Sequence, residues 1–378
     1  MPDQPKIKVL VCGVLPPPTF GHSKMYAMLM ASSFPSDTDV KFLNLHFWSY
    51  KTNKKVTGGK LVMMLKYYVQ YIWFILSFRP KYVLYNMSFY RMPFLKDFLF
   101  CATGIVLGRG VVMHDMGQYV RELYGVVPTW QKAMLRWMLK HMTASIVMGE
   151  RVRPVYEGLA DPRKIMVVPG VVEDTRQLDV VANRPKGLFN VLYFSHMSRP
   201  KGILTAFEST ALILDACSDA AVTFAGPMED ADISDRLEVL QKMYPGRVRY
   251  LGYIEDGRER TAIFRGADVF MFTTLRDVFG LVLLHAMAES VPVVASLEGT
   301  IPEIVVDGQT GLLFEKGNAR TCALHVIRFL TDQALRHQMG NAGRQRFESV
   351  FGLDKYGASM TQVFQKLGNK ESFPLGRT

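Results

Sequence analysis

Residues 273–296 read TTLRDVFGLVLLHAMAESVPVVAS and directly continue the apolar run ADVFMF. The pattern predicts a buried strand, a loop that contains Asp277 and Gly280, and a helix that begins at about Leu281. The first turn of a helix presents unpaired backbone N–H groups and the positive end of the helix dipole, which together favour an anion. Gly280 allows a ligand to approach the backbone closely. The stretch is therefore either an ordinary strand–loop–helix unit or part of an anion-binding site.

Strand-like and helical patterns alternate along the whole chain. The strand-like runs are Ile7–Val14, Val40–Leu45, Tyr82–Tyr85, Gly110–His114, Ala144–Met148, Ile165–Val168, Phe189–Phe194, Ala221–Ala225, Val248–Leu251, Val269–Phe272, Val293–Ala295 and Gly311–Phe314. The helical patterns include His22–Ser32, Met92–Leu107, Thr129–His141, Lys201–Leu214, Ile233–Tyr244 and Leu281–Glu289. Repeated strand–helix units predict an α/β fold with parallel sheets and helices on both faces, that is, doubly wound Rossmann-like domains.

The length of 378 residues indicates two domains, because it exceeds what one ordinary core supports. We expect an N-terminal domain over residues 1–170, a polar and proline-bounded linker over 171–185, and a C-terminal domain over 186–353. Residues 354–378 are expected to form a C-terminal helix that packs back toward the N-terminal domain. Ligands of open parallel sheets lie outside the carboxyl ends of the strands, so the chemistry is expected in the loops that follow them.

Cysteine usage and the start of the chain predict a cytoplasmic protein. The four cysteines have neither the spacing of a zinc site nor that of a disulfide framework, which fits a reducing compartment. The N-terminus runs into an apolar strand without the pattern of a secretory signal. The longest apolar stretch, Leu61–Phe78, is interrupted by Lys66 and Gln70 and is not expected to span a membrane.

Charge is distributed unevenly between the two halves. Residues 1–164 contain 22 Lys and Arg and 9 Asp and Glu, whereas residues 165–378 contain 23 and 25. A basic N-terminal half predicts an anionic partner: a phosphate-bearing acceptor, a membrane surface or nucleic acid. The apolar stretch 61–78 and the basic, aromatic stretch 130–141 (WQKAMLRWMLKH) are each candidates for a helix on an anionic membrane or for core packing. The asymmetry favours a peripheral contact with the inner face of the cell membrane, and no motif supports nucleic acid.

The stretch around Gly280 resembles the signature of glycosyltransferase family 4, whose members have the GT-B architecture of two facing Rossmann-like domains. The family pattern is Glu-x-Phe-Gly-Leu, three residues, a second Glu with Ala-Met-Ala, and later Pro-Val-Val-Ala. The matching residues are Phe279, Gly280, Leu281, Ala286, Met287, Ala288, Pro292, Val293, Val294 and Ala295. Residues 299–314 (GTIPEIVVDGQTGLLF) and 250–256 (YLGYIED) resemble the flanking family blocks, so the resemblance covers most of the C-terminal half.

The resemblance implies a retaining glycosyltransferase that uses neither a metal nor a cofactor. Such an enzyme moves a sugar from a nucleoside-diphosphate sugar, held by the C-terminal domain, to a hydroxyl acceptor. The acceptor is bound by the N-terminal domain and is expected to be a lipid-linked or cell-surface glycan intermediate. Domain closure over the donor is expected.

Two donor-binding positions depart from the family pattern. Asp277 stands where the family has its first Glu, which contacts the hydroxyls of the donor sugar, and a shorter carboxylate can still accept those bonds. His285 stands where the second Glu holds the ribose hydroxyls. Glu289, one helical turn further, either compensates for His285 or is a solvated residue at the helix end. Tyr253, in the YLGYIED block, is a further donor-binding candidate.

The stretch 192–209 (LYFSHMSRPKGILTAFES) predicts a strand, a loop and a helix. Lys201 matches the family lysine that grips the donor diphosphate. The family arginine five residues earlier is replaced by His196, and nearby Arg199 could supply the missing charge. Cations belong here because the leaving diphosphate gains negative charge as the glycosidic bond breaks.

The N-terminal half contributes two candidates. His114 ends a predicted strand (VVMHDMGQ, 111–118), where a histidine is either structural or, as the resemblance implies, directed toward the donor sugar. Gly21, in the loop of CGVLPPPTFGHSK (12–24), matches the family glycine near the donor phosphates and sugar. This loop is not GxGxxG, which argues against a nicotinamide-dependent oxidoreductase.

Two Asp-x-Asp pairs, Asp37/Asp39 and Asp230/Asp232, resemble the spacing of metal-dependent transferases but are interpreted as structural, the second as a helix cap. The replacements at His196 and His285 leave one alternative open. In that alternative the chain is a catalytically weakened GT-B protein that acts as a binding or scaffold subunit.

Overall fold

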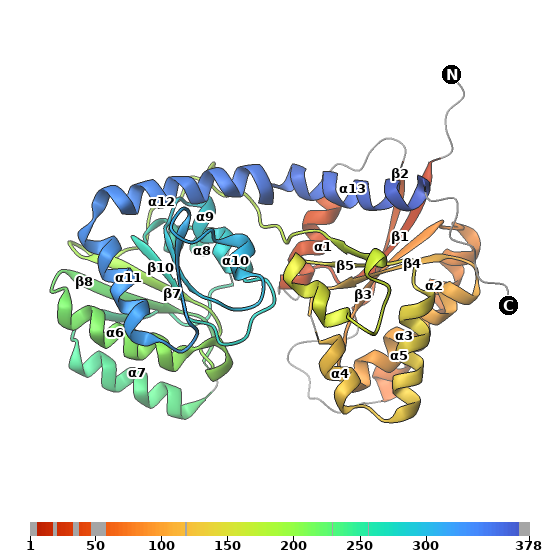
Figure 1. Ribbon diagram of the computed structural model, residues 1–378, viewed down its shortest axis with the longest axis horizontal. Coiled ribbons are helices and arrows are strands. Elements are labelled where there is room, and N and C mark those ends of the chain that lie inside the picture. Colours follow the sequence, from red (N-terminus) through yellow and green to blue (C-terminus); the bar gives the residue numbers. More distant parts are fainter. Residues whose placement is uncertain are drawn as a thin grey trace, which may run out of the picture. The chain divides into compact units, whose positions relative to one another are not determined.

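The computed structural model describes residues 6–17, 21–32, 38–46, 58–117, 119–228, 230–255 and 257–369. Contacts divide the chain into two compact units. Unit 1 comprises Met1–Gly170 together with Leu353–Thr378, and unit 2 comprises Val171–Gly352 (Figure 1). Each unit is built around one six-stranded parallel sheet.

The sheet of unit 1 has the strand order β2-β1-β3-β4-β5-β6. Its strands are β1 (Ile7–Gly13), β2 (Thr38–Asn44), β3 (Tyr82–Met87), β4 (Gly110–Asp115), β5 (Ala144–Val147) and β6 (Ile165–Val167). Its helices are α1 (Gly21–Ala31), α2 (Gly58–Ser77), α3 (Arg91–Val106), α4 (Val120–Val126), α5 (Thr129–His141) and α13 (Leu353–Asn369). Successive residues of β3, β4 and β5 are buried, so helices and loops cover both faces of this sheet.

The sheet of unit 2 has the strand order β12-β11-β10-β7-β8-β9. Its strands are β7 (Phe189–Phe194), β8 (Ala220–Ala225), β9 (Val248–Tyr250), β10 (Val269–Phe272), β11 (Val293–Ser296) and β12 (Gly311–Phe314). Its helices are α6 (Ile203–Ala216), α7 (Ala231–Met243), α8 (Gly257–Arg265), α9 (Leu281–Ala288), α10 (Ile301–Ile304), α11 (Ala319–Thr331) and α12 (Gln333–Arg346). The four inner strands are almost entirely buried, which explains their continuous apolar runs.

The predicted fold class, two doubly wound parallel sheets with helices, is confirmed. Each predicted strand overlaps a strand of the structure, and β2 shows the kind of boundary error involved, since it begins two residues before the predicted start at Val40. Helix α2 coincides with most of the apolar stretch Leu61–Phe78, a candidate for a helix on a membrane or in the core. The expectation that the two domains face each other stays a prediction.

Within the described residues, no helix is long and apolar enough to cross a membrane. The four cysteines are buried free thiols. The same residues contain no group of three or more His, Cys, Asp or Glu arranged to hold a metal ion.

A histidine with an altered pKa lies in the core of unit 1. His114, near the end of β4, is fully buried, and its Nδ1 lies 3.3 Å from the hydroxyl of Tyr26. The two rings meet edge to face, with centroids 5.7 Å apart. Its Nε2 has no hydrogen-bond partner among the described residues. Burial, and to a smaller extent the neighbouring His22, lowers the pKa of His114 to about 3, so the buried imidazole is neutral near pH 7.

This burial predicts acid destabilisation of unit 1. The folded-state pKa lies below the ordinary histidine pKa of about 6.5, so the unfolded chain binds the proton first as the pH falls. The free energy of unfolding should decrease from about pH 6.5 toward pH 3, by about 2 kcal/mol between pH 6.5 and pH 5. Urea titrations followed by tryptophan fluorescence measure it in unit 1, because that unit contains all four tryptophans.

The variant His114→Asn should flatten this pH dependence, since it removes the titrating group. The same substitution at exposed His141 is the matched control. Equal slopes for the wild type and His114→Asn would contradict the assignment.

Candidate functional site

The loops after β7 and β10 are bonded to each other. These strands are parallel neighbours, so their carboxyl ends emerge side by side. The carbonyl oxygen of Pro200 accepts the N–H groups of Leu275 and Arg276, each at 3.0 Å. The hydroxyl of Thr273 donates to the carbonyl oxygen of Gly202 at 2.8 Å. Residues about 75 positions apart in sequence therefore form one rigid surface at the edge of the sheet.

Gly202 is required by this contact. It has φ of +69°, and a Cβ on it would lie 1.7 Å from the carbonyl oxygen of Thr273. No other residue fits there without moving the backbone. The glycine of the Lys-Gly pair is therefore structural, and its close approach brings the preceding Lys201 to the loop after β10.

Lys201 and Asp277 form an ion pair across the two loops. The Nζ of Lys201 lies 2.7 Å from Oδ2 of Asp277 and 3.4 Å from the carbonyl oxygen of Arg276. The two side chains are 30% and 15% exposed, so the pair is accessible to a ligand but partly desolvated. The other carboxylate oxygen, Oδ1, accepts the N–H groups of Val278 at 2.7 Å and Gly280 at 3.3 Å. Asp277 thus orders the turn before α9 and neutralises the lysine.

The residues at the start of α9 present mainly backbone groups to the surface formed by the loops after β7 and β10. Gly280 has φ of +71° and is the N-cap of α9, and Leu281 is the first helical residue. Phe279 is only 2% exposed and packs edge-on against Phe351, with ring centroids 6.2 Å apart. Because the Phe279 side chain fills the core, it anchors the loop and does not itself reach a ligand.

Neighbouring loops close around this surface. A Cβ on Gly226, after β8, would lie 1.9 Å from the carbonyl oxygen of Ser195, after β7. The N–H of Gly226 donates to the carbonyl of Gly252, which precedes the 57% exposed Tyr253. On the other side, the hydroxyl of Thr300 donates to the carbonyl of Val278 at 2.8 Å. Loops after five adjacent strands therefore meet, and Tyr253 lies on the one after β9.

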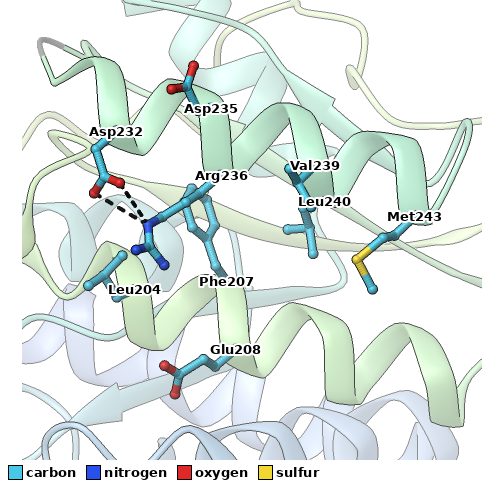
Figure 2. A pocket seen from close by; sticks show the side chains of 9 residues that line it. All are labelled: Leu204, Phe207, Glu208, Asp232, Asp235, Arg236, Val239, Leu240 and Met243. Carbon is cyan, nitrogen blue, oxygen red and sulfur yellow. Dashed lines mark hydrogen bonds and ion pairs between the residues drawn. The ribbon is translucent and has the colours of Figure 1, made fainter.

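Arg199 forms its ion pair with a different carboxylate from the one that binds Lys201. It begins a 3₁₀ turn, Arg199–Lys201, and its guanidinium forms an ion pair with Asp232 on α7. Asp232 also accepts Arg236 at 3.2 Å (Figure 2). Asp232 and Arg236 lie at one end of a groove of about 370 Å³ between α6 and α7. A diphosphate would have to compete with Asp232 for Arg199.

The two histidines that replace family residues lie on the same unit. His196 is half-buried in the loop after β7, and its carbonyl oxygen accepts the N–H of Ser198. His285 is half-buried in the second turn of α9, with its ring 5.8 Å from that of Phe264.

Glu289 has a structural role, which corrects the interpretation of a solvated residue. Its carboxylate pairs with Arg265 at 3.0 Å and accepts the hydroxyl of Thr175 at 2.7 Å, and its side chain is 5% exposed. The pair connects the segment that enters unit 2 to α8 and α9.

The Asp-x-Asp pairs have the expected ordinary positions where they are described. Asp230 is the N-cap of α7 and accepts the N–H of Asp232 at 3.1 Å. Asp39 lies in β2, opposite Lys8 of β1, and Asp37 lies outside the described residues.

Unit 1 contains its own pocket, which sequence reasoning missed. A cavity of about 200 Å³ lies beside the carboxyl ends of β1 and β3 and is lined by Gly13, His22, Asn86, Ser88 and Lys96, among others. The Oδ1 of Asn86 is buried without a hydrogen-bond partner in the described part of the chain. Polar residues directly after strand-like runs were the available signal. Of the predicted candidates in unit 1, Gly21 is the first residue of α1 and His114 lies in the core beside Tyr26.

The match to a family model lies within unit 2. Residues 174–346 match the family model described as glycosyl transferases group 1. The capsular polysaccharide biosynthesis glycosyltransferase CapM of Staphylococcus aureus is 27% identical over 163 residues, which are 43% of this chain and 42% of CapM. Glycogen synthase of Mycobacterium tuberculosis is 25% identical over 269 residues, 69% of this chain and 63% of the synthase. The chain therefore matches less than two thirds of the length of these relatives.

Among solved structures, HepE of Anabaena in complex with UDP-glucose is similar with a TM-score of 0.69 at 13% identity, over 95% of this chain and 99% of HepE. At this identity the likeness shows the fold, which is that of GT-B proteins with two Rossmann-like domains. The matched residues 174–346 contain the Lys201–Asp277 pair and the loops around it. Residues 174–346 of the chain therefore match the group 1 glycosyl transferases, glycosyltransferase family 4.

Proposed function

We propose that the protein is a retaining, metal-independent glycosyltransferase that moves a sugar from a nucleoside-diphosphate sugar to a hydroxyl acceptor. The observation that carries the proposal is the Lys201–Asp277 pair, 2.7 Å apart where the loops after β7 and β10 meet. A cation and a carboxylate at this edge of a parallel sheet, beside the N-terminus of α9, suit a ligand with a diphosphate at one end and sugar hydroxyls at the other.

In this proposal Lys201 and Asp277 exchange their ion pair for contacts with the donor. When the donor binds, its diphosphate takes over the ammonium of Lys201, and the carboxylate of Asp277 becomes available to the sugar hydroxyls. As the bond between the anomeric carbon and the diphosphate oxygen breaks, the leaving group gains negative charge, which Lys201 stabilises. The departing phosphate oxygen takes the proton of the acceptor hydroxyl as its oxygen bonds to the anomeric carbon. Positioning and electrostatics therefore suffice, without a protein nucleophile.

The remaining candidates have supporting roles in this proposal. The backbone of Gly280 and Leu281 faces the phosphate or sugar, His285 binds the ribose, and Tyr253 lies toward the base. His196 adds a second donor beside Lys201. The contributions of His114 and Gly21, which belong to unit 1, stay predictions.

The donor is best sought among uridine nucleotide sugars, because HepE, a protein of the same fold, is described in complex with UDP-glucose. The direct test is a thermal-shift screen of the purified chain with UDP-, GDP- and ADP-sugars. A ligand that binds only the folded state raises the unfolding temperature in proportion to its saturation. If none of these nucleotide sugars stabilises the protein, the donor site proposed here does not exist.

The acceptor fits the basic unit 1. We infer a lipid-linked or cell-surface glycan intermediate, reached by a cytoplasmic enzyme in peripheral contact with the inner face of the cell membrane. The excess of 22 basic over 9 acidic residues in residues 1–164 supports an anionic acceptor or surface.

A second candidate function is a binding or scaffold subunit without turnover. It is favoured by His196 and His285, which stand where the family has an arginine and a glutamate, and by the pairing of Arg199 with Asp232. Stabilisation by a nucleotide sugar without hydrolysis or transfer to any acceptor would select this function.

Replacing Lys201 by Ala should reduce the rate of sugar transfer about 10²- to 10³-fold, because it removes one fixed charge from the leaving group. Donor binding should weaken as well, since the diphosphate loses its cation. Lys242→Ala, an exposed lysine of α7, is the matched control and should retain full activity. Undiminished transfer by Lys201→Ala would refute the role of this residue.

Replacing Asp277 by Asn should separate nucleotide binding from sugar transfer. The free nucleoside diphosphate should bind at least as tightly, with a gain of up to about fivefold, because the carboxylate no longer neutralises the partly exposed Lys201. Transfer should fall about 10²-fold, because the carboxylate no longer accepts the sugar hydroxyls. Calorimetry and initial rates measure the two effects, with Glu238→Gln on α7 as control. Parallel loss of both would indicate that Asp277 only maintains the loop.

A further inference from the structure

The outer face of α2 is apolar and exposed. Large hydrophobic side chains that are 39% to 69% exposed line it: Leu61, Val62, Met63, Leu65, Val69, Trp73 and Leu76. Most of them recur every three or four residues and so form one stripe. The opposite side of the helix buries Tyr71 and Ile75 in the core of unit 1. A helix on the surface of a globular protein ordinarily has a polar outer face, so this stripe requires a partner.

Helix α3 extends the apolar surface. A groove of about 400 Å³ lies between α2 and α3 and is lined almost entirely by apolar atoms. On the α3 side its wall includes Leu99, Val106 and Leu107, which are 38%, 74% and 39% exposed. We use the name α2–α3 face for this groove together with the stripe on α2. The α2–α3 face is a continuous apolar area, whereas an ordinary surface exposes hydrophobic residues singly.

The surrounding charge is of one sign. The described residues 58–109, which include both helices, contain seven Lys and Arg and one acidic residue, Asp97. Asp97 is fully buried, where it accepts the hydroxyl of Tyr85 at 2.9 Å, the N–H of Ser88 at 2.9 Å and the ammonium of Lys96. The stretch that builds the α2–α3 face therefore contributes basic residues and no exposed acid to the surface.

The two observations together match a lipid surface. Apolar side chains enter the boundary of the acyl chains, tryptophan favours the interface, and lysine reaches the headgroups with its long stem. The only charged residues of α2 are Lys60 and Lys66. No described helix is long and apolar enough to span, so α2 is suited to lie along the bilayer. A protein partner would meet the same apolar stripe, but the basic charge of residues 58–109 favours anionic lipid.

The basic aromatic helix α5 is the weaker candidate. It buries Leu135, Met138 and Leu139 in the core, and its Lys132 and Arg136 lie over the ring of Tyr124. The structure thus assigns α5 to core packing and leaves α2 as the exposed apolar helix.

We propose that the α2–α3 face binds the surface of an anionic bilayer, with α2 lying in the headgroup region parallel to the membrane. The proposal specifies the membrane contact suggested above for the acceptor. It does not depend on sugar transfer, because lipid binding can be measured without a donor.

The test is sedimentation of the full chain with vesicles of phosphatidylglycerol and phosphatidylcholine, compared with phosphatidylcholine alone. The wild type should bind the anionic vesicles and bind the neutral ones more weakly. The double variant Leu65→Gln with Val69→Gln should lose about 10²-fold in affinity, since two apolar side chains no longer enter the lipid. Lys60→Gln with Lys66→Gln should lose binding to anionic vesicles by about tenfold or more.

The matched control lies in unit 2. Val239 and Met243 of α7 are 56% and 60% exposed, similar to the residues of the stripe. Val239→Gln with Met243→Gln should bind vesicles as the wild type does. Because the substituted apolar side chains of α2 and α7 are exposed, these two double variants should keep the wild-type unfolding temperature.

Three outcomes would overturn the proposal. The wild type does not bind anionic vesicles; the α2 variant binds them as tightly as the wild type; or the wild type self-associates without lipid and the α2 variant is monomeric. In the last case the α2–α3 face is an interface between copies of the chain. Each result is independent of donor stabilisation, so it leaves the proposed transfer activity to its own test.

Discussion

The candidate site of unit 2 depends on the contact between the loops after β7 and β10. Pro200 and Gly202 on one loop receive hydrogen bonds from the backbone and side chains of the other, and the missing Cβ of Gly202 makes the approach possible. Parallel strands that are buried on both faces leave only their ends for polar chemistry. Neighbouring strands bring those ends together, and the loop contact then fixes the position of Lys201 relative to Asp277.

Charge in this site is compensated before any ligand arrives. Lys201 is held by Asp277, and Arg199 is held by Asp232. Both pairs remain partly exposed, so their energies are small and a ligand with several charges can replace them. The arrangement keeps two cations at one sheet edge without strong mutual repulsion. In the proposed donor site, a diphosphate would compete with the carboxylates of Asp277 and Asp232 for these two cations.

The α2–α3 face of unit 1 differs from the candidate site of unit 2, because it exposes mainly apolar side chains. Asp97, the single acidic residue among residues 51–109, is buried in the core. Helix α2, in contrast, exposes large apolar side chains at the surface. Buried Asp97 is tolerated because three donors satisfy it. His114, buried beside Tyr26 in the same unit, is neutral because burial disfavours its charged form. Unit 2 thus presents partly exposed ion pairs that a charged ligand can replace, and unit 1 presents an apolar face on a basic stretch of the chain.

The sequence by itself determined the strands, the fold class and the resemblance of the C-terminal half to a family. Runs such as Phe189–Phe194 are apolar because both faces of the sheet are covered, and this cause is local enough to be visible along the chain. The spacing of Asp277, Gly280 and the following helix was also visible, since it repeats a local strand–loop–helix geometry.

Only the tertiary structure decided which charges meet. Lys201 and Asp277 are 76 residues apart, and the partners of Arg199 and Glu289 are likewise remote or on other elements. It also decided which apolar helix is exposed, because α2 and α5 both carry apolar and basic residues and only packing distinguishes them. Periodicity records how a residue relates to its near neighbours, whereas pairing and exposure depend on elements that the chain brings together after folding.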